Sequence, residues 1–136
     1  MQQANEIKVG LIGYPKTGKT KFIEKLLYGD SSVNKPYKPT LGVDVKPYDI
    51  TYMNVKYRIN LWDCAGNPRY IGLGKDYIQD AEHVFIFKDE THDNTVYEGW
   101  LSENTNFSYV DMNVENPIAN IISDIKNKII KPYSEL

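Results

Sequence analysis

The stretch Gly13-Tyr14-Pro15-Lys16-Thr17-Gly18-Lys19-Thr20 fits the pattern G-x-x-x-x-G-K-[ST], a glycine-rich loop whose backbone amides surround phosphate groups. Residues 7–12 before it form an apolar run interrupted only at Lys8, as in a buried strand. After it, apolar residues recur on one helical face, and Gly29 with Asp30 ends that helix. The stretch is therefore predicted to connect a strand to a helix, whose apolar residues are Phe22, Ile23, Leu26 and Leu27.

This loop is predicted to be a phosphate-binding site. Its amides and the start of the following helix would surround the α- and β-phosphates of a nucleotide. Lys19 would reach the β- and γ-phosphates, and the hydroxyl of Thr20 would bind Mg²⁺. The alternative is a glycine-rich turn without a ligand, but the strand and the helix beside the loop favour the phosphate site. The other residues expected to contact phosphate are Gly13, Lys16, Thr17 and Gly18.

The rest of the chain predicts an α/β fold. Two β-rich runs, residues 43–52 and 56–62, are separated by a short turn near Met53 and Asn54, so an antiparallel hairpin is expected. Residues 83–87 form another apolar run, expected to be a central strand. A C-terminal amphipathic helix is expected from Pro117, with Ile118, Ile121, Ile122, Ile125 and Ile129 on its apolar face. This order predicts a mostly parallel sheet with one antiparallel hairpin strand.

In residues 89–116 the apolar periodicity that predicts helices and strands is weaker than in the rest of the chain. Tyr97, Trp100 and Leu101 are placed to face inward from a short helix. Phe107 and Tyr109 alternate with other residues as in a strand. The two histidines, His83 and His92, are too few and too isolated for a metal site.

Length and composition limit the classes of function. The chain has 136 residues, the size of one domain, and we expect residues 1–136 to form a single unit. Its 16 basic and 18 acidic residues give a net charge of -2, which offers no basic field for nucleic acid. The single cysteine, Cys64, excludes an intramolecular disulfide. No apolar run has the length of a membrane helix and no lipid-anchor motif ends the chain, so a soluble, intracellular protein without a membrane anchor is expected.

A second motif follows the predicted hairpin. In Trp62-Asp63-Cys64-Ala65-Gly66, the Asp63 carboxylate would hold the magnesium ion through water. The amide of Gly66 would approach a γ-phosphate without interference from a side chain. A D-x-x-G pattern alone is weak, but it gains weight one hairpin after a phosphate-binding loop.

With these motifs the chain resembles the Ras-like small GTPases, which have a P-loop NTPase fold of three layers, and among them most closely the Ran group. The likeness is carried by residues 37–45, 60–66 and 72–79. It implies GTP or GDP as ligand with Mg²⁺, Thr40 as a ligand of the metal and the γ-phosphate, and Tyr37 closing over the phosphates. It also implies Ran-type regulators or nuclear transport receptors as partners, in the cytoplasm or nucleus.

The chain departs from that family at positions that matter for hydrolysis. Asn67 stands where the family has a glutamine that orients the attacking water, and its side chain is one methylene shorter. Pro15, which has no amide donor, and Lys16 stand where the family has two glycines. With Lys19, Thr40 and Asn67 as the catalytic residues, slow GTP hydrolysis is expected.

The residues that read guanine in the family are missing. No Asn-Lys-x-Asp motif occurs, and residues 107–113 look like the family's last strand followed by a degraded Ser-Ala-Lys loop. The family's fifth strand and fourth helix would then be absent, and the C-terminal part of the fold shortened. We expect the sheet edge left in this way to be covered by a second copy of the chain.

Two other functions compete with a small GTPase. One is a catalytically idle module that mimics Ran to occupy its partners, favoured by Asn67 and the missing base motif. The other is a P-loop kinase, disfavoured because Arg58 and Arg69 are the only arginines available to clamp a transferred phosphate.

The abundance of Lys, Asn, Ile and Tyr, which have AT-rich codons, points to an AT-rich genome such as that of a large DNA virus or a protist.

Overall fold

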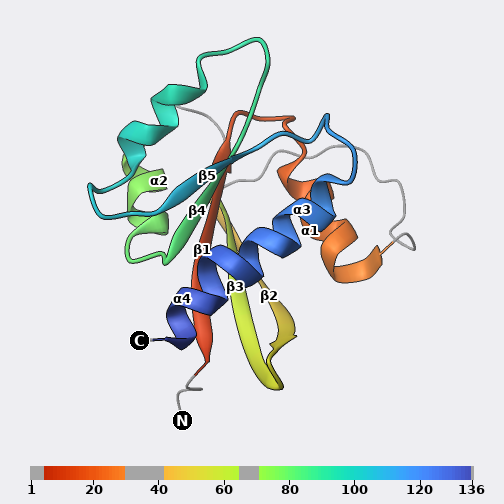
Figure 1. Ribbon diagram of the computed structural model, residues 1–136. Helices are drawn as coiled ribbons and strands as arrows, with labels where there is room; N and C mark the ends of the chain where they lie inside the picture. Colours follow the sequence, from red (N-terminus) through yellow and green to blue (C-terminus); the bar gives the residue numbers. More distant parts are fainter. Residues whose placement is uncertain (1–4, 30–41, 65–70, 136) are drawn as a thin grey trace.

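The computed structural model describes residues 5–29, 42–64 and 71–135, and Figure 1 shows their arrangement. A mixed sheet lies at the centre, and helical segments cover both of its faces. The elements in chain order are β1 (Glu6–Gly13), α1 (Lys19–Tyr28), β2 (Val43–Tyr52), β3 (Val55–Cys64), α2 (Ile71–Ile78), β4 (His83–Phe87), η3 (Asn94–Trp100), β5 (Phe107–Val110), α3 (Pro117–Asp124), η4 (Ile125–Ile130) and α4 (Lys131–Ser134).

The strands of the sheet have the order β2-β3-β1-β4-β5. β1 pairs in parallel with β3 and β4, and β4 pairs in parallel with β5, whereas β2 and β3 are antiparallel. The predicted sheet, mostly parallel with one antiparallel hairpin strand, is confirmed. The hairpin turns at Met53 (φ 52°) and Asn54 (φ 64°), since two residues with positive φ give the turn whose twist matches that of the strands.

Two apolar clusters divide the core into the predicted three layers. On one face of the sheet, α1 and the C-terminal helical segments pack on Ile7, Leu11, Phe85 and their neighbours. On the other face, Ile78 of α2 and the buried Tyr97 and Trp100 of η3 pack on β1, β3 and β4. The short helix expected to carry Tyr97 and Trp100 inward is therefore present.

The C-terminal helix begins at Pro117 as predicted, but it is not regular throughout. The segment α3 leads directly into the wider π-turns of η4 and then into α4. The wide turns end before Pro132, which has no N–H to bond to the carbonyl of Lys128 four residues earlier. Ile121, Ile125 and Ile129 nevertheless face the core as the spacing predicted.

One strand, β5, follows β4 between residues 88 and 135, so the predicted shortening of the C-terminal part is confirmed. β5 lies at the edge of the sheet, with Val110 turned to the core and Phe107 and Tyr109 exposed by 40% and 37%.

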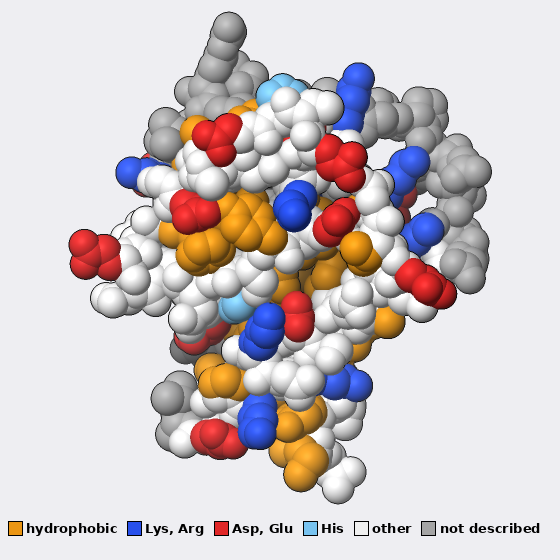
Figure 2. Space-filling model, turned by 45° about the horizontal axis from the view of Figure 1, so that its top comes forward, with side chains coloured by type: hydrophobic (Ala, Val, Ile, Leu, Met, Phe, Trp, Pro, Cys, Tyr) orange, Lys and Arg blue, Asp and Glu red, His pale blue; other side chains and the backbone are white. Residues whose placement is uncertain are grey.

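On the face drawn in Figure 2, acidic and basic side chains are interspersed around a group of hydrophobic ones. In the described residues, no helix has the length and apolar character needed to cross a bilayer.

Candidate functional site

Residues 13–20 connect β1 to α1 as a tight loop whose two glycines are required by their surroundings. Gly13 has φ 147°, and a Cβ there would lie 2.7 Å from the carbonyl oxygen of Phe87 at the end of β4. Gly18 has φ 98°, and a Cβ there would lie 3.3 Å from Cγ of Met112. A side chain at Gly13 would press on the backbone of β4, and one at Gly18 would press on the Met112 side chain after β5.

The Lys19 side chain crosses back under this loop. It is 6% exposed, and its Nζ donates to the carbonyl oxygens of Gly13 at 3.0 Å and Tyr14 at 3.3 Å. Desolvation lowers the pKa of Lys19, and the nearby Asp63 carboxylate opposes that shift. A buried ammonium bonded to neutral carbonyls gains from an anion placed in the loop, because the anion compensates for its lost hydration.

The start of α1 is open to an anion. Its N-cap is Gly18, which has no side chain to cap the helix, and the first turn contains no acidic residue. The Thr17 hydroxyl donates to the Tyr14 carbonyl at 2.9 Å, a hydrogen bond within the loop that stabilises its conformation. The positive end of the helix dipole therefore faces the loop, with no acidic residue in the helix's own first turn.

Thr20 and Asp63 meet beside the loop. Thr20 Oγ1 donates to Asp63 Oδ2 at 3.4 Å, and Asp63 is 2% exposed at the end of β3. The two side chains border a hollow of about 200 Å³ between α1 and β2. A hydroxyl and a carboxylate oxygen are the hard donors that Mg²⁺ takes together with phosphate and water, so the pair fits this ion. Among the described residues, no three His, Cys, Asp or Glu side chains gather as a metal site.

Pro15 and Lys16 form the exposed tip of the loop. Lys16 has φ 65°, in the left-handed region that glycine adopts at much lower cost. A lysine in this conformation leaves strain in the backbone at the tip of the loop.

Of the residues expected to act in the site, the structure brings seven together, and four lie outside the described residues. Tyr37, Thr40, Gly66 and Asn67 belong to the second group, so their expected roles stay predictions. The first group consists of Gly13, Lys16, Thr17, Gly18, Lys19, Thr20 and Asp63.

The segment after β5 occupies the side of the loop next to Gly18. Met112 packs there, within 3.3 Å of the Cβ position of Gly18. Asp111 accepts a hydrogen bond from the amide of Asn113 at 2.9 Å, and the Asn113 side chain donates to Glu90 at 3.0 Å. This side of the loop thus presents a thioether and an amide engaged with a carboxylate.

Cys64 lies next to Asp63 and is fully buried. Burial raises the pKa of its thiol to about 12, with the Asp63 carboxylate adding to the shift. A thiol in this state is a poor nucleophile, as expected of a small residue that fills space.

A contact between the loop and the segment after β4 was not predicted from the sequence. The ring of Tyr14 stacks on His92, with ring centroids 4.4 Å apart, and its hydroxyl donates to the Asp93 carbonyl at 3.0 Å. Tyr14 and Asp93 are separated by 79 residues. Local sequence patterns do not indicate contacts between residues so far apart in the chain. From the sequence alone, His92 therefore looks like an ordinary surface residue.

A comparison of the chain with protein-family models shows which family has this site. The family model described as "Ras of Complex, Roc, domain of DAPkinase" matches residues 8–124. The match runs from β1 to the end of α3 and includes the loop, Thr20 and Asp63. Roc domains are Ras-like GTPase domains, which bind guanine nucleotides as molecular switches. Since the match covers most of the chain, this protein belongs to the Roc family of Ras-like GTPase domains.

Proposed function

We propose that this Roc-family chain binds a guanine nucleotide together with Mg²⁺ at the loop of residues 13–20. The amides of the loop and the open start of α1 hold the α- and β-phosphates. The Lys19 ammonium turns from the carbonyls of Gly13 and Tyr14 to the β- and γ-phosphates when the ligand enters. The other members of this proposed phosphate site are Lys16, Thr17 and Gly18.

The observation that carries this proposal is the state of Lys19. A desolvated ammonium lies under a loop whose helix start has no side-chain cap. Burying a charge in this way costs free energy without a compensating anion, so the arrangement suits a site that is filled in the working protein. A purely structural glycine turn has no need of a buried lysine.

Magnesium is proposed at the pair Thr20 and Asp63, with Thr40 as a further ligand. The hydroxyl of Thr20 would be a ligand of the ion, and the Asp63 carboxylate, whose Oδ2 lies 3.4 Å from that hydroxyl, would hold it through water. The ion, when bound, neutralises charge on the β- and γ-phosphates.

We further propose a slow switch. By the family resemblance, Tyr37, Thr40 and Gly66 respond to the γ-phosphate, and Asn67 positions the attacking water poorly. Lys19 and the loop amides stabilise the charge that develops during hydrolysis. Residues 1–136 act in this proposal as one truncated domain in the cytoplasm or nucleus.

The likeness to the Ran group belongs with these proposals. It rests on the sequence of residues 37–45 and 60–66, whereas the matching family is Roc. Regulation by Ran-type regulators or nuclear transport receptors, and an origin in a large DNA virus, stay predictions.

A second candidate is an idle interaction module. It is favoured by the segment after β5, where Met112 packs on Gly18 and no Asn-Lys-x-Asp motif occurs. In that case, partner binding would not respond to the nucleotide. Turnover accelerated by a GTPase-activating protein would contradict it.

The proposal is tested by comparing GDP affinity in the full chain and in two lysine variants. Lys19→Met keeps the length of the buried side chain but removes its charge, and it should weaken binding by about 100-fold or more. Lys25→Met removes an exposed lysine from the last turn of the same helix and should leave the affinity unchanged. Equal affinities in both variants would contradict a phosphate site at Lys19.

A further inference from the structure

β5 is an edge strand whose outer side pairs with no other strand among the described residues. On its inner side, the carbonyl oxygens of Asn106 and Val110 accept hydrogen bonds from amides of β4 and of the residue after it, at 2.9 Å and 2.8 Å. Successive residues of a strand turn their main-chain groups to opposite sides. The amides and carbonyls of Phe107 and Tyr109 therefore point away from β4.

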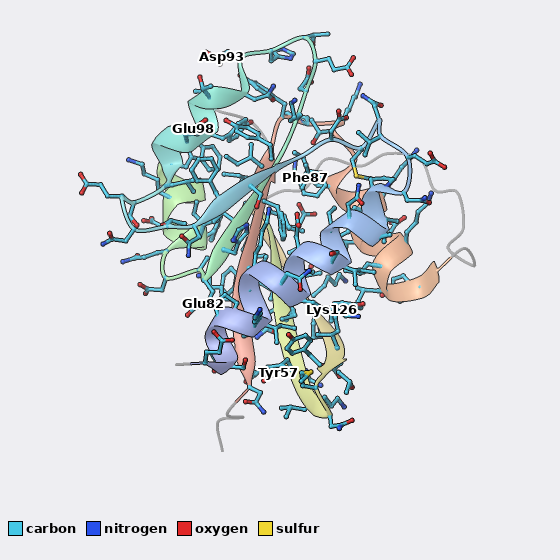
Figure 3. All side chains as sticks on the ribbon, viewed as in Figure 1. Tyr57, Glu82, Phe87, Asp93, Glu98 and Lys126 are labelled. Carbon is cyan, nitrogen blue, oxygen red and sulfur yellow. The ribbon has the colours of Figure 1, made fainter. Side chains whose placement is uncertain are left out.

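The side chains of Phe107 and Tyr109 form an aromatic pair on one face of this strand. Their ring centroids are 6.0 Å apart, the rings meet edge to face, and both side chains are exposed. The Tyr109 hydroxyl donates to the carboxylate of Glu98, which Figure 3 shows on η3. This hydrogen bond holds the aromatic pair in place beside the outward-pointing main-chain groups.

The two edges of the sheet differ in their protection against pairing with another strand. β2, the opposite edge, carries the charged residues Asp44, Lys46 and Asp49, and also Pro47, which has no amide to donate. Charged residues and proline are common means by which an edge strand is kept from pairing with another chain. Residues 104–110 contain neither a charged residue nor a proline. The edge at β5 is therefore suited to accept a further strand.

The pattern of β5 fits a copy of itself that runs antiparallel. With a twofold axis at Ser108, Phe107 of each copy lies opposite the partner's Tyr109. Because the main-chain groups of both residues point outward, each such pair can exchange both of its hydrogen bonds. Aromatic side chains directly opposite each other on adjacent strands add favourable contacts. Asp111, the first acidic residue after the strand, then lies opposite the partner's Thr105, so like charges are not placed opposite each other.

We propose that β5 is a dimerisation surface, at which two copies of the chain join their five-stranded sheets by antiparallel pairing of residues 106–110. A second copy supplies the uncharged strand, the matching aromatic pair and the symmetric order of residues about Ser108. The inference does not depend on the proposed nucleotide site, because none of the paired residues belongs to that site.

Sedimentation equilibrium of the full chain, without nucleotide, measures this pairing. Two short strands bury little surface, so we expect a weak dimer with a Kd of about 10–100 µM. Phe107→Lys places a charge on the edge and should weaken dimerisation by about tenfold or more, since a symmetric dimer contains the change twice. Circular dichroism confirms that the variant is folded.

Val45→Lys is the matched control. Val45 is 42% exposed against 40% for Phe107, but it lies in β2 at the opposite edge of the sheet. The same substitution there should leave the Kd of the dimer unchanged. A loss of dimerisation that is equal in the two variants, or that is absent from Phe107→Lys, would contradict pairing at β5.

Amide hydrogen exchange of the unchanged chain shows which groups pair, and it does not depend on the folding of a variant. Raising the concentration from well below to well above the Kd should slow exchange at Phe107 and Tyr109 by about fivefold or more. The amide of Ser108 points to β4 in both states and should change less. A dimer in which the amides of Phe107 and Tyr109 gain no protection would overturn the inference. So would a chain that stays monomeric at about 500 µM, which would leave the edge to a strand of another protein.

Discussion

Thr20 Oγ1 lies 3.4 Å from Asp63 Oδ2, which joins the first turn of α1 to the end of β3 beside the phosphate-binding loop. β1 directly precedes the loop and α1 in the chain, and it pairs with β3 at Leu11 and Asp63. The loop and the carboxylate are thus held in fixed register by the sheet.

Thr20→Ala should reduce the gain in GDP affinity that Mg²⁺ provides by about tenfold or more, because one direct oxygen ligand is lost. Thr20→Ser keeps the hydroxyl and should retain most of that gain. Titration of GDP with and without Mg²⁺ measures the difference. A Mg²⁺ effect of the same size in Thr20→Ala would exclude Thr20 as a ligand of the ion.

Lys16 offers a test of strain in the loop. Since Lys16 has φ 65°, Lys16→Gly should be more stable to urea than Lys16→Ala by about 1 kcal/mol. Both variants lose the same charge, so the comparison isolates the backbone. The idea of stored strain fails if Lys16→Ala unfolds at the same urea concentration as Lys16→Gly or at a higher one.

Gly13→Ala tests the close approach of the loop to β4. The new Cβ would lie 2.7 Å from the Phe87 carbonyl oxygen at φ 147°, and we expect a loss of about 2–4 kcal/mol in the free energy of unfolding. Gly99→Ala is the control, because a Cβ at Gly99 has no neighbour within 4 Å among the described residues. Similar effects of the two substitutions on urea denaturation would contradict the described contact.

The buried His83 should lower the free energy of unfolding in mild acid. The buried ring contacts Ser108 Oγ at 2.6 Å, and its Nδ1 has no hydrogen-bond partner among the described residues. Burial, with a smaller repulsion from Lys128 and an opposing attraction to Asp124, lowers its pKa from 6.5 to about 4. The unfolded chain therefore binds the proton first, and stability falls as the pH drops from about 6.5 to 4.

The size of this effect is roughly 3 kcal/mol at pH 4, because the folded-state pKa lies about 2.5 below the unfolded value. His83→Gln should remove this part of the pH dependence, while the protonation of carboxylates remains in both proteins. Urea denaturation between pH 7 and pH 4 measures the difference between them. Parallel pH profiles of the two proteins would show that His83 does not carry the effect.

The sequence predicted the elements that depend on local signals. The loop glycines, the hairpin turn at Met53 and Asn54, and the isoleucine spacing after Pro117 each act within a few residues, and the structure has them where they were expected. Element boundaries agree within about three residues, since caps such as Gly29 end them.

Other features depend on distant contacts, and the sequence did not reveal them. The stack of Tyr14 on His92 joins segments that meet only because β1 and β4 are neighbours in the sheet. The π-turns of η4 arise from the position of Pro132 in a helix that otherwise looks regular by periodicity. The seven described residues of the proposed site were predicted from one motif and one carboxylate, because phosphate chemistry restricts which residue types stand at which spacing.

The most direct test of the account measures binding of GTP, GDP, ATP and ADP to the full chain, each with Mg²⁺ and with a chelator. We expect saturable binding of GTP and GDP that Mg²⁺ strengthens and that Lys19→Met weakens by about 100-fold or more. If none of the four nucleotides binds under either condition, the loop of residues 13–20 is not a working phosphate site and the central claim is wrong.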